Sequence, residues 1–393
     1  MAGRASSPPP ERAVNLEQLL AAKEIVLVCG SGGVGKTTTA AALGAMAAVH
    51  LGGKVLVLTV DPARRLAAAL GLESFGNVET RISASAFTDA GADPKGEMWV
   101  AMLDTKQSWD DLVRQHAPSP EVRDAILANP LYGNITGKFV QSHDYIAMER
   151  LYEIHASGRY DLVIVDTPPT RHALDFLDAP QRMADFFSGR LLRWLTVGYR
   201  SRLVTVASRP FYLVADRILG TKFLEDIAEF FGLFQTMEKG FIERARLVSQ
   251  VLADRRTTFC VVSTLEAAPA HEAEFFVREL GARKLHLGAL ILNKVLPPGL
   301  REPEAAAAAA VLRREAAALA TELAPLLDVD PAQLGRVLAE VARSFDDYRL
   351  AATREAEQRA ELAASPDITV AVPYVEADIH DVAGLLRLAT QMG

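Results

Sequence analysis

The chain has 393 residues, of which half are hydrophobic and 23% are charged, and its formal net charge is −7 at pH 7. This balance is typical of a globular protein with a large core and excludes a disordered chain. The acidic balance argues against a general nucleic-acid binder, and the lack of an apolar run of roughly 18 residues argues against a membrane span.

The first residues, MAGRASSPPPER, lack the apolar segment of a signal peptide. They predict a flexible N-terminal tail over residues 1–22. The two cysteines, Cys29 and Cys260, lie in apolar, strand-like runs, which indicates reduced core thiols in a cytoplasmic protein. There is no CxxC motif and no histidine pair at metal-ligand spacing, so a structural zinc site is not expected.

Short β-branched runs alternate with helical patterns along the chain. Several runs are apolar on both faces, as parallel strands covered by helices must be. The pattern predicts an α/β fold built on a doubly wound, mostly parallel sheet, with ligands at the carboxyl ends of the strands. The predicted strands are residues 24–29, 54–60, 98–103, 160–166, 257–263, 287–293 and 368–372.

The connections between the third and fourth predicted strands and between the fourth and fifth are too long for simple crossovers, and both have helical patterns. We therefore expect a domain over residues 23–393, with a helical subdomain inserted at about residues 104–157 and 175–252. The alanine-rich stretch 302–324, which carries interspersed charges, predicts a further strong helix.

A glycine-rich loop joins the first predicted strand to an alanine-rich helix. Gly30, Gly35, Lys36 and Thr37 fit the phosphate-binding pattern G-x-x-x-x-G-K-[ST]. Backbone N–H groups of such a loop turn toward phosphate oxygens, and the lysine adds a positive charge. The residues expected to bind ATP here are Gly30, Ser31, Gly32, Gly33, Val34, Gly35, Lys36, Thr37 and Thr38.

Two aspartates follow apolar strands and should lie at the same edge of the sheet as the loop. They are Asp61 in LTVDPARRL and Asp166 in VIVDTPPTRH. Such an arrangement suits one acid that positions the attacking water and one in the shell of Mg²⁺, which the Thr37 hydroxyl would also bind. The later segment Asn293-Lys294-Val295-Leu296 has leucine where a guanine-reading N-K-x-D motif has aspartate, so ATP is favoured over GTP.

Together these segments resemble the ArsA-like, or anion-transporting, ATPases, which include the arsenite-pump ATPase and the ATPase that targets tail-anchored membrane proteins. The loop GSGGVGKTT is similar to the family's G-K-G-G-V-G-K-T, and the stretches beginning at Asp61 and Asp166 look like switches I and II. The resemblance implies the deviant Walker A class of P-loop NTPases and ATP hydrolysis at a dimer interface. Asp61 would orient water, Asp166 would sense the γ-phosphate and Mg²⁺, and Asn293 and Pro373 would frame adenine.

Three features depart from that family pattern. The arsenite-binding cysteines of the pump and the CxxC of some targeting members have no counterparts here. The family's second loop lysine, which reaches the nucleotide of the partner subunit, is replaced by Ser31. A serine cannot supply that charge. Three alternatives therefore stay open: a homodimer without this charge, a heterodimer with a paralogue that carries the lysine, and another basic residue of this chain in the role of the loop lysine.

An apolar stripe at helical spacing runs through the second inserted region. It is made of Phe223, Ile227, Phe230, Phe234, Met237 and Phe241, and Phe187, Leu191 and Trp194 form a second patch. Packing within the subdomain is the simpler interpretation, and a groove for an apolar client helix or a membrane partner is the other.

Alternatives to an ATPase that reshapes its helical subdomain belong to other classes. A nucleotide-gated chaperone with little turnover would bind the same nucleotide, and an arsenite-pump subunit would respond to metalloids. A small-molecule kinase would need an acceptor site and an arginine-bearing lid, which the sequence does not reveal.

Overall fold

The fold is that of a computed structural model, which describes residues 15–60, 67, 70, 72, 76–133, 140–188, 221–362, 368–375 and 379–393. Eight strands form one sheet in the order β3-β4-β2-β5-β1-β6-β7-β8. Their bounds are β1 Ile25–Cys29, β2 Gly53–Thr59, β3 Thr80–Arg81, β4 Gly96–Met102, β5 Leu162–Asp166, β6 Thr257–Ser263, β7 Leu287–Val295 and β8 Thr369–Pro373. All neighbouring strands pair in parallel except β3 and β4. The predicted α/β class is confirmed, and β3 is an edge strand that the sequence pattern missed.

Helices cover both faces of this sheet, and the alternation of β1 shows why. Ile25 and Leu27 belong to one apolar cluster, whereas Val26 and Val28 belong to the other, because successive side chains of a strand point to opposite faces. Helices α9 (Thr170–Ser188), α13 (Glu238–Ala253) and α14 (Ala267–Ala282) contribute to the first cluster. Helices α1 (Leu16–Ala21), α2 (Lys36–His50) and α17 (Val382–Met392) contribute to the second.

The N-terminal tail predicted over residues 1–22 is too long, because α1 occupies its last part. Asn15 caps this helix by accepting a hydrogen bond from the backbone N–H of Gln18. Leu16, Leu19 and Leu20 are buried in the core, so the segment is a packed element of the domain. Residues 1–14 lie outside the described part of the chain.

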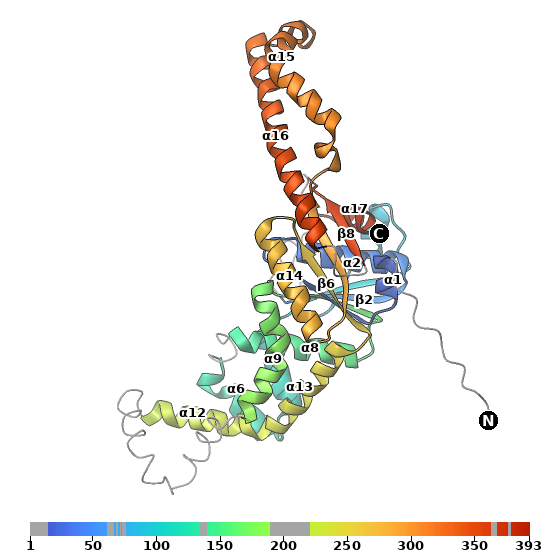
Figure 1. Cartoon of the computed structure of the whole chain (residues 1–393). Helices are drawn as coiled ribbons and strands as arrows, with labels where there is room; N and C mark the ends of the chain where they lie inside the picture. Colours follow the sequence, from blue (N-terminus) through green and yellow to red (C-terminus); the bar gives the residue numbers. More distant parts are fainter. Residues whose placement is uncertain are drawn as a thin grey trace, which may run out of the picture.

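The remaining helices of the inserted regions gather beyond one edge of the sheet, at the lower end of Figure 1. They are α5 (Thr105–His116), α6 (Pro120–Ala128), α8 (Val140–Ala156) and α12 (Thr221–Phe234), and a short 3₁₀ turn, η1 (Gln235–Met237), joins α12 to α13. The stripe predicted on one continuous helix is therefore interrupted by that turn.

The C-terminal half of that stripe is core. Phe230, Phe234, Met237 and Phe241 are at most 5% exposed and pack into the same cluster as Trp109. These four residues cannot line an open groove, and for them the client-groove hypothesis is wrong. The side chains of Phe223, Ile227, Phe187, Leu191 and Trp194 lie outside the described residues.

A helical hairpin projects from the opposite end of the molecule (Figure 1). Its helices are α15 (Pro303–Leu327), which extends the helix predicted over 302–324, and α16 (Pro331–Leu362), which the sequence analysis did not propose. None of the helices that the structure describes is both long and apolar enough to cross a bilayer. The smaller elements are α4 (Ala84–Asp89) and the 3₁₀ turn η2 (Pro298–Arg301).

Candidate nucleotide site

The glycine-rich loop connects β1 to α2 at the carboxyl edge of the sheet, as predicted. A Cβ atom at Gly30 would lie 2.1 Å from the carbonyl oxygen of Val262, so only glycine fits beside β6. Gly35 has a φ of 97°, and a Cβ there would lie 2.3 Å from Nδ2 of Asn293. Gly30 is required by the close approach to the β6 backbone and Gly35 by its positive φ, and a glycine backbone of this kind exposes N–H groups to a phosphate.

Lys36 is the first residue of α2 and is 8% exposed. Its Nζ donates a hydrogen bond to the carbonyl oxygen of Ser31 at 3.0 Å, so the ammonium group lies across the loop. The N-terminal end of α2 adds the positive end of the helix dipole at the same place. The loop therefore combines a fixed cation, a helix N-terminus and glycine backbone, which together favour an anionic ligand.

Asp166, at the end of β5, joins this loop to the neighbouring strands. Its Oδ2 accepts hydrogen bonds from Oγ1 of Thr37 at 2.7 Å and from Oγ1 of Thr59 at 3.0 Å. The carboxylate is 1% exposed. A buried carboxylate beside hydroxyl oxygens is a donor set that suits Mg²⁺, a hard cation that prefers oxygen ligands. The chemistry of these residues thus fits the predicted magnesium site.

Thr38, Ser31 and Asp61 complete the predicted set of site residues around the loop. Thr38 lies in the first turn of α2 and is partly buried. The Ser31 hydroxyl is buried and has no hydrogen-bond partner among the described residues. Asp61, the predicted water-positioning residue, lies outside the described residues.

Asn293 and Pro373 lie on adjacent strands, β7 and β8, near the same edge of the sheet. Nδ2 of Asn293 donates to the carbonyl oxygen of Val34 at 2.8 Å, so this side chain supports the loop from the side. Pro373 pairs in register with Val295 and is exposed. The structure brings Asn293 against the loop and Pro373 onto the neighbouring strand, and the contact of either residue with adenine stays a prediction.

Lys294 was not among the predicted binding residues. Its backbone has a φ of 58°, and its Nζ donates to the carbonyl oxygen of Gly33 at 3.3 Å. Two residues further on, the chain contacts the hairpin, because the backbone N–H of Leu296 donates to Oε2 of Glu355 in α16 at 2.9 Å. Burial raises the pKa of the Glu355 carboxyl, while the hydrogen bond from Leu296 opposes that shift.

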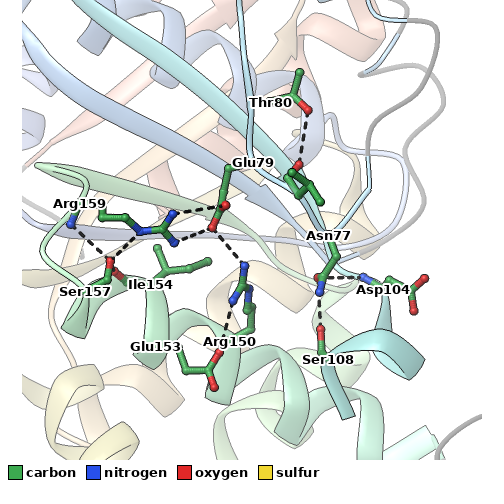
Figure 2. A network of polar contacts seen from close by, with 11 residues as sticks. Asn77, Glu79, Thr80, Asp104, Ser108, Arg150, Glu153, Ile154, Ser157 and Arg159 are labelled. Atoms are coloured by element: carbon green, nitrogen blue, oxygen red, sulfur yellow. Dashed lines mark hydrogen bonds and ion pairs between the residues drawn. The ribbon is translucent and has the colours of Figure 1, made fainter. Parts of the chain in front are cut away.

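A polar network anchors the chain between the region of Asp61 and β3 (Figure 2). Oε1 of Glu79 accepts hydrogen bonds from Arg150 at 3.1 Å and from Arg159 at 2.8 Å. Oδ1 of Asn77 accepts from the Ser108 hydroxyl at 3.2 Å. Arg150 lies on α8 and Ser108 on α5, so this network fixes residues 77–79 to helices of the inserted regions.

A second acidic cluster lies inside those helices. Ligand atoms of His116, Glu149 and Glu153 are within 4.8 Å of one another. However, Nε of Arg244 lies 2.7 Å from Oε1 of Glu149, and the Tyr145 hydroxyl donates to Oε2 at 2.8 Å. Burial raises the pKa of Glu149, and the adjacent guanidinium partly offsets this effect. Because a guanidinium already pairs with the buried carboxylate, the cluster is a contact between α8 and α13 and does not suit a cation.

Two residues of the site, Thr59 and Lys294, were not predicted from the sequence. Thr59 lies at the end of β2, two residues before Asp61, and a threonine at the end of a strand carries no sequence signal that it belongs to the site. In the sequence, Lys294 stands only as the lysine of an incomplete guanine-reading motif, Asn293-Lys294-Val295-Leu296. Its position against the loop depends on its left-handed backbone, which the sequence does not disclose.

The sequence of the chain is similar to those of known proteins. A family model described as anion-transporting ATPase matches residues 23–317, a segment that holds the loop, Asp166 and strands β1 to β7. An ATPase ASNA1 homolog from Entamoeba dispar is 28% identical over 295 residues, which are 72% of this chain and 80% of that protein. ATPase GET3 from Malassezia globosa is 26% identical over 277 residues, which are 69% of this chain and 72% of that protein. Because the family match covers most of the chain together with its phosphate-binding loop, the protein belongs to the anion-transporting ATPase (ArsA) family and is an ATPase.

Proposed function

We propose that the chain hydrolyses ATP with Mg²⁺ at the edge formed by β1, β2 and β5. The observation that carries this proposal is the 2.7 Å hydrogen bond between Thr37 and Asp166, which unites the phosphate loop with the end of β5. In this proposal Thr37 and Asp166 hold the cation, which would neutralise charge on the phosphates. Lys36 binds the β- and γ-phosphate oxygens, for which it exchanges its present contact with the Ser31 carbonyl.

Asp61 has the role of orienting the attacking water in this proposal, because it comes two residues after Thr59, with which β2 ends beside Asp166. ATP is the proposed nucleotide. Leu296 cannot accept hydrogen bonds from a guanine edge, and its backbone N–H is already used by Glu355. Asn293 and Pro373 flank the proposed adenine position from β7 and β8.

The direct test measures ATP affinity by calorimetry with Mg²⁺ and with a chelator, for the wild type, Thr37→Ala and Asp166→Asn. We expect Mg²⁺ to strengthen binding in the wild type and to have much less effect in both variants. Thr321→Ala and Asp347→Asn, both at exposed positions of the hairpin, are the matched controls and should behave as the wild type. Equal Mg²⁺ dependence in all five proteins would refute the assignment of the cation site.

We further propose that nucleotide state is transmitted to the helical subdomain through Glu79. This residue follows the region of Asp61 in the chain and is paired with Arg150 of α8. Hydrogen exchange of α8 should change on addition of ATP in the wild type and change less in Glu79→Ala. Glu97→Ala, which removes a more exposed ion pair with Arg81, is the control. An identical response of both variants would exclude this route.

A dimer formed at the nucleotide edge is also part of the proposal. Ser31 supplies no charge to a partner subunit, so a paralogue with lysine at that position would complete the site of this chain. Within the chain itself, Lys294 is the residue that could supply the missing charge, because its ammonium group already donates a hydrogen bond to the loop. A client helix or a membrane partner would use surfaces other than the buried stripe. We place this activity in the cytoplasm, a proposal supported by two buried, free cysteines.

A further inference from the structure

The foot of α16, residues 351–362, packs on the body of the domain. Ala352 and Leu362 are buried there, and Leu362 belongs to the same core cluster as α14. Tyr348 and Leu350, further up the helix, are more than half exposed. Helix α16 contacts η2 and α14, and its lower end lies next to α14 in Figure 1. The foot is therefore the part of the hairpin through which it can act on the rest of the protein.

Glu355 lies in this foot and is only partly exposed. Burial raises the pKa of its carboxyl group, and the carboxylate of Glu266, at the start of α14, raises it further. A charge in such a place is costly unless hydrogen bonds compensate for the lost water. The compensating bond comes from the backbone N–H of Leu296, which donates to Oε2 of Glu355 at 2.9 Å.

Leu296 is the last backbone donor of a stiff connection. Strand β7 ends at Val295, and the two residues after Leu296 are Pro297 and Pro298, which have no N–H group. A residue before a proline is also restricted to extended conformations. A hydrogen bond at Leu296 therefore fixes the end of β7 relative to α16.

The residues just before Val295 form a strained turn against the phosphate loop. Lys294 has a φ of 58°, a left-handed conformation that is unfavourable for a residue with a Cβ and persists where surrounding contacts hold it. From the loop side, the side chains of Asn293 and Lys294 donate to the carbonyl oxygens of Val34 and Gly33. From the hairpin side, the bond to Glu355 holds the same short segment.

We propose that Glu355 is a positioning residue of the nucleotide site. By holding Leu296, it keeps residues 293–296 in the conformation that supports the phosphate loop, so the hairpin strengthens nucleotide binding. The inference rests on the proposed function, in which this loop binds the phosphates of ATP. Glu355 acts through Leu296 and is not one of the residues that hold the cation, so the chemical step itself should not depend on it. Such a coupling is reciprocal, and bound nucleotide should in turn stabilise the foot of α16.

Calorimetry of ADP binding with Mg²⁺ tests the proposal on four full-length proteins. Beside the wild type, Glu355→Ala removes the acceptor, Glu355→Gln keeps an oxygen that can accept from Leu296, and Glu357→Ala makes the same change at an exposed position of the foot. Loss of one hydrogen bond should weaken ADP binding about 3- to 10-fold in Glu355→Ala. The other two variants should bind within about twofold of the wild type. In Glu355→Ala the KM for ATP should rise by a similar factor, while kcat stays within about twofold of the wild type.

Three results would overturn the positioning role. They are unchanged ADP affinity in Glu355→Ala, an equal loss of affinity in Glu355→Gln, and a fall in kcat at constant KM. A wild type that binds no nucleotide would instead refute the proposed function on which this inference rests.

Hydrogen exchange measures the same coupling from the hairpin side and needs no hydrolysis. Saturating ADP should slow the exchange of backbone amides in residues 351–362 of the wild type and of Glu357→Ala. In Glu355→Ala this slowing should be lost, whereas the slowing in α2 should remain because ADP still fills the loop. No slowing of the foot in the wild type, or the same slowing in Glu355→Ala, would contradict a coupling through Glu355.

Discussion

Replacing Phe234 with alanine separates the two interpretations of the aromatic stripe. The side chain is 5% exposed, and its ring centroid lies 4.6 Å from that of Phe230 and 6.1 Å from that of Phe241. Trp109 and Tyr132 each lie 6.4 Å away. Phe→Ala in a core costs about 3–5 kcal/mol, and each aromatic pair adds about 0.5–1.5 kcal/mol beyond burial. We therefore expect Phe234→Ala to lower the free energy of unfolding by about 4 kcal/mol.

The assay is guanidinium unfolding followed by circular dichroism, with Phe275→Ala as the matched control. Phe275 lies on α14 and is 47% exposed, so the same chemical change there should cost only about 1–2 kcal/mol. Binding of ATP at low temperature should be unchanged in both variants. A Phe234→Ala variant as stable as the wild type would refute the assignment of this residue to the core and would revive the groove hypothesis at this position.

Three further predictions concern the site and the thiols. Asp61→Asn should retain ATP binding but lose hydrolysis by about 10²- to 10⁴-fold, since the amide cannot act as a base, and equal turnover would remove Asp61 from the mechanism. Ser31→Lys should accelerate the isolated chain if the missing charge limits it, whereas an unchanged rate in Ser31→Lys and a loss in Lys294→Ala would assign that charge to Lys294. Cys29 and Cys260 should resist alkylation at pH 8 in the folded protein. Burial raises both pKa values to about 12, which leaves a thiolate fraction of about 10⁻⁴, and rapid native-state labelling would contradict this.

The sheet could be predicted because its signal is local. Strands such as β1 and β6 are apolar on both faces, and their limits in the structure fall within a few residues of the predicted ones. Strand β3 has two residues and no apolar alternation, so its place at the edge depends on pairing with β4. Helix α1 was missed because a proline-rich start suggested that the whole segment was a tail, although three buried leucines fix it to the core.

The loop and its acid could also be predicted, because a short motif and a strand end determine them. The pairing of Thr37 with Asp166 follows from parallel strands that end at one edge. Thr59 could not be recognised in the same way, since a threonine at the end of a strand has many roles. The contacts of Lys294 with Gly33 and of Glu355 with Leu296 join distant parts of the chain, and sequence patterns do not record such pairs.

The packing of the helices beyond the sheet could not be predicted, because periodicity shows which face of a helix is apolar and does not show what covers that face. The stripe that includes Phe230 and Phe241 is buried by α5 and α8, whereas the similar row that includes Val337 and Val341 is exposed. Both have the spacing of an amphipathic helix. Only the tertiary arrangement distinguishes a core from a surface. In the inserted region, this arrangement shows that the stripe through Phe230 and Phe241 is core and not an open groove.

Steady-state release of phosphate from ATP by the purified chain tests the central claim most directly. The assay compares the wild type, Lys36→Ala and Asp166→Asn, each with Mg²⁺ and with a chelator, and GTP replaces ATP in a parallel series. We predict hydrolysis that requires Mg²⁺, prefers ATP and is abolished in both variants, while their circular dichroism spectra match that of the wild type. Hydrolysis that persists in folded Lys36→Ala and Asp166→Asn proteins would contradict the assignment of the active site to this loop.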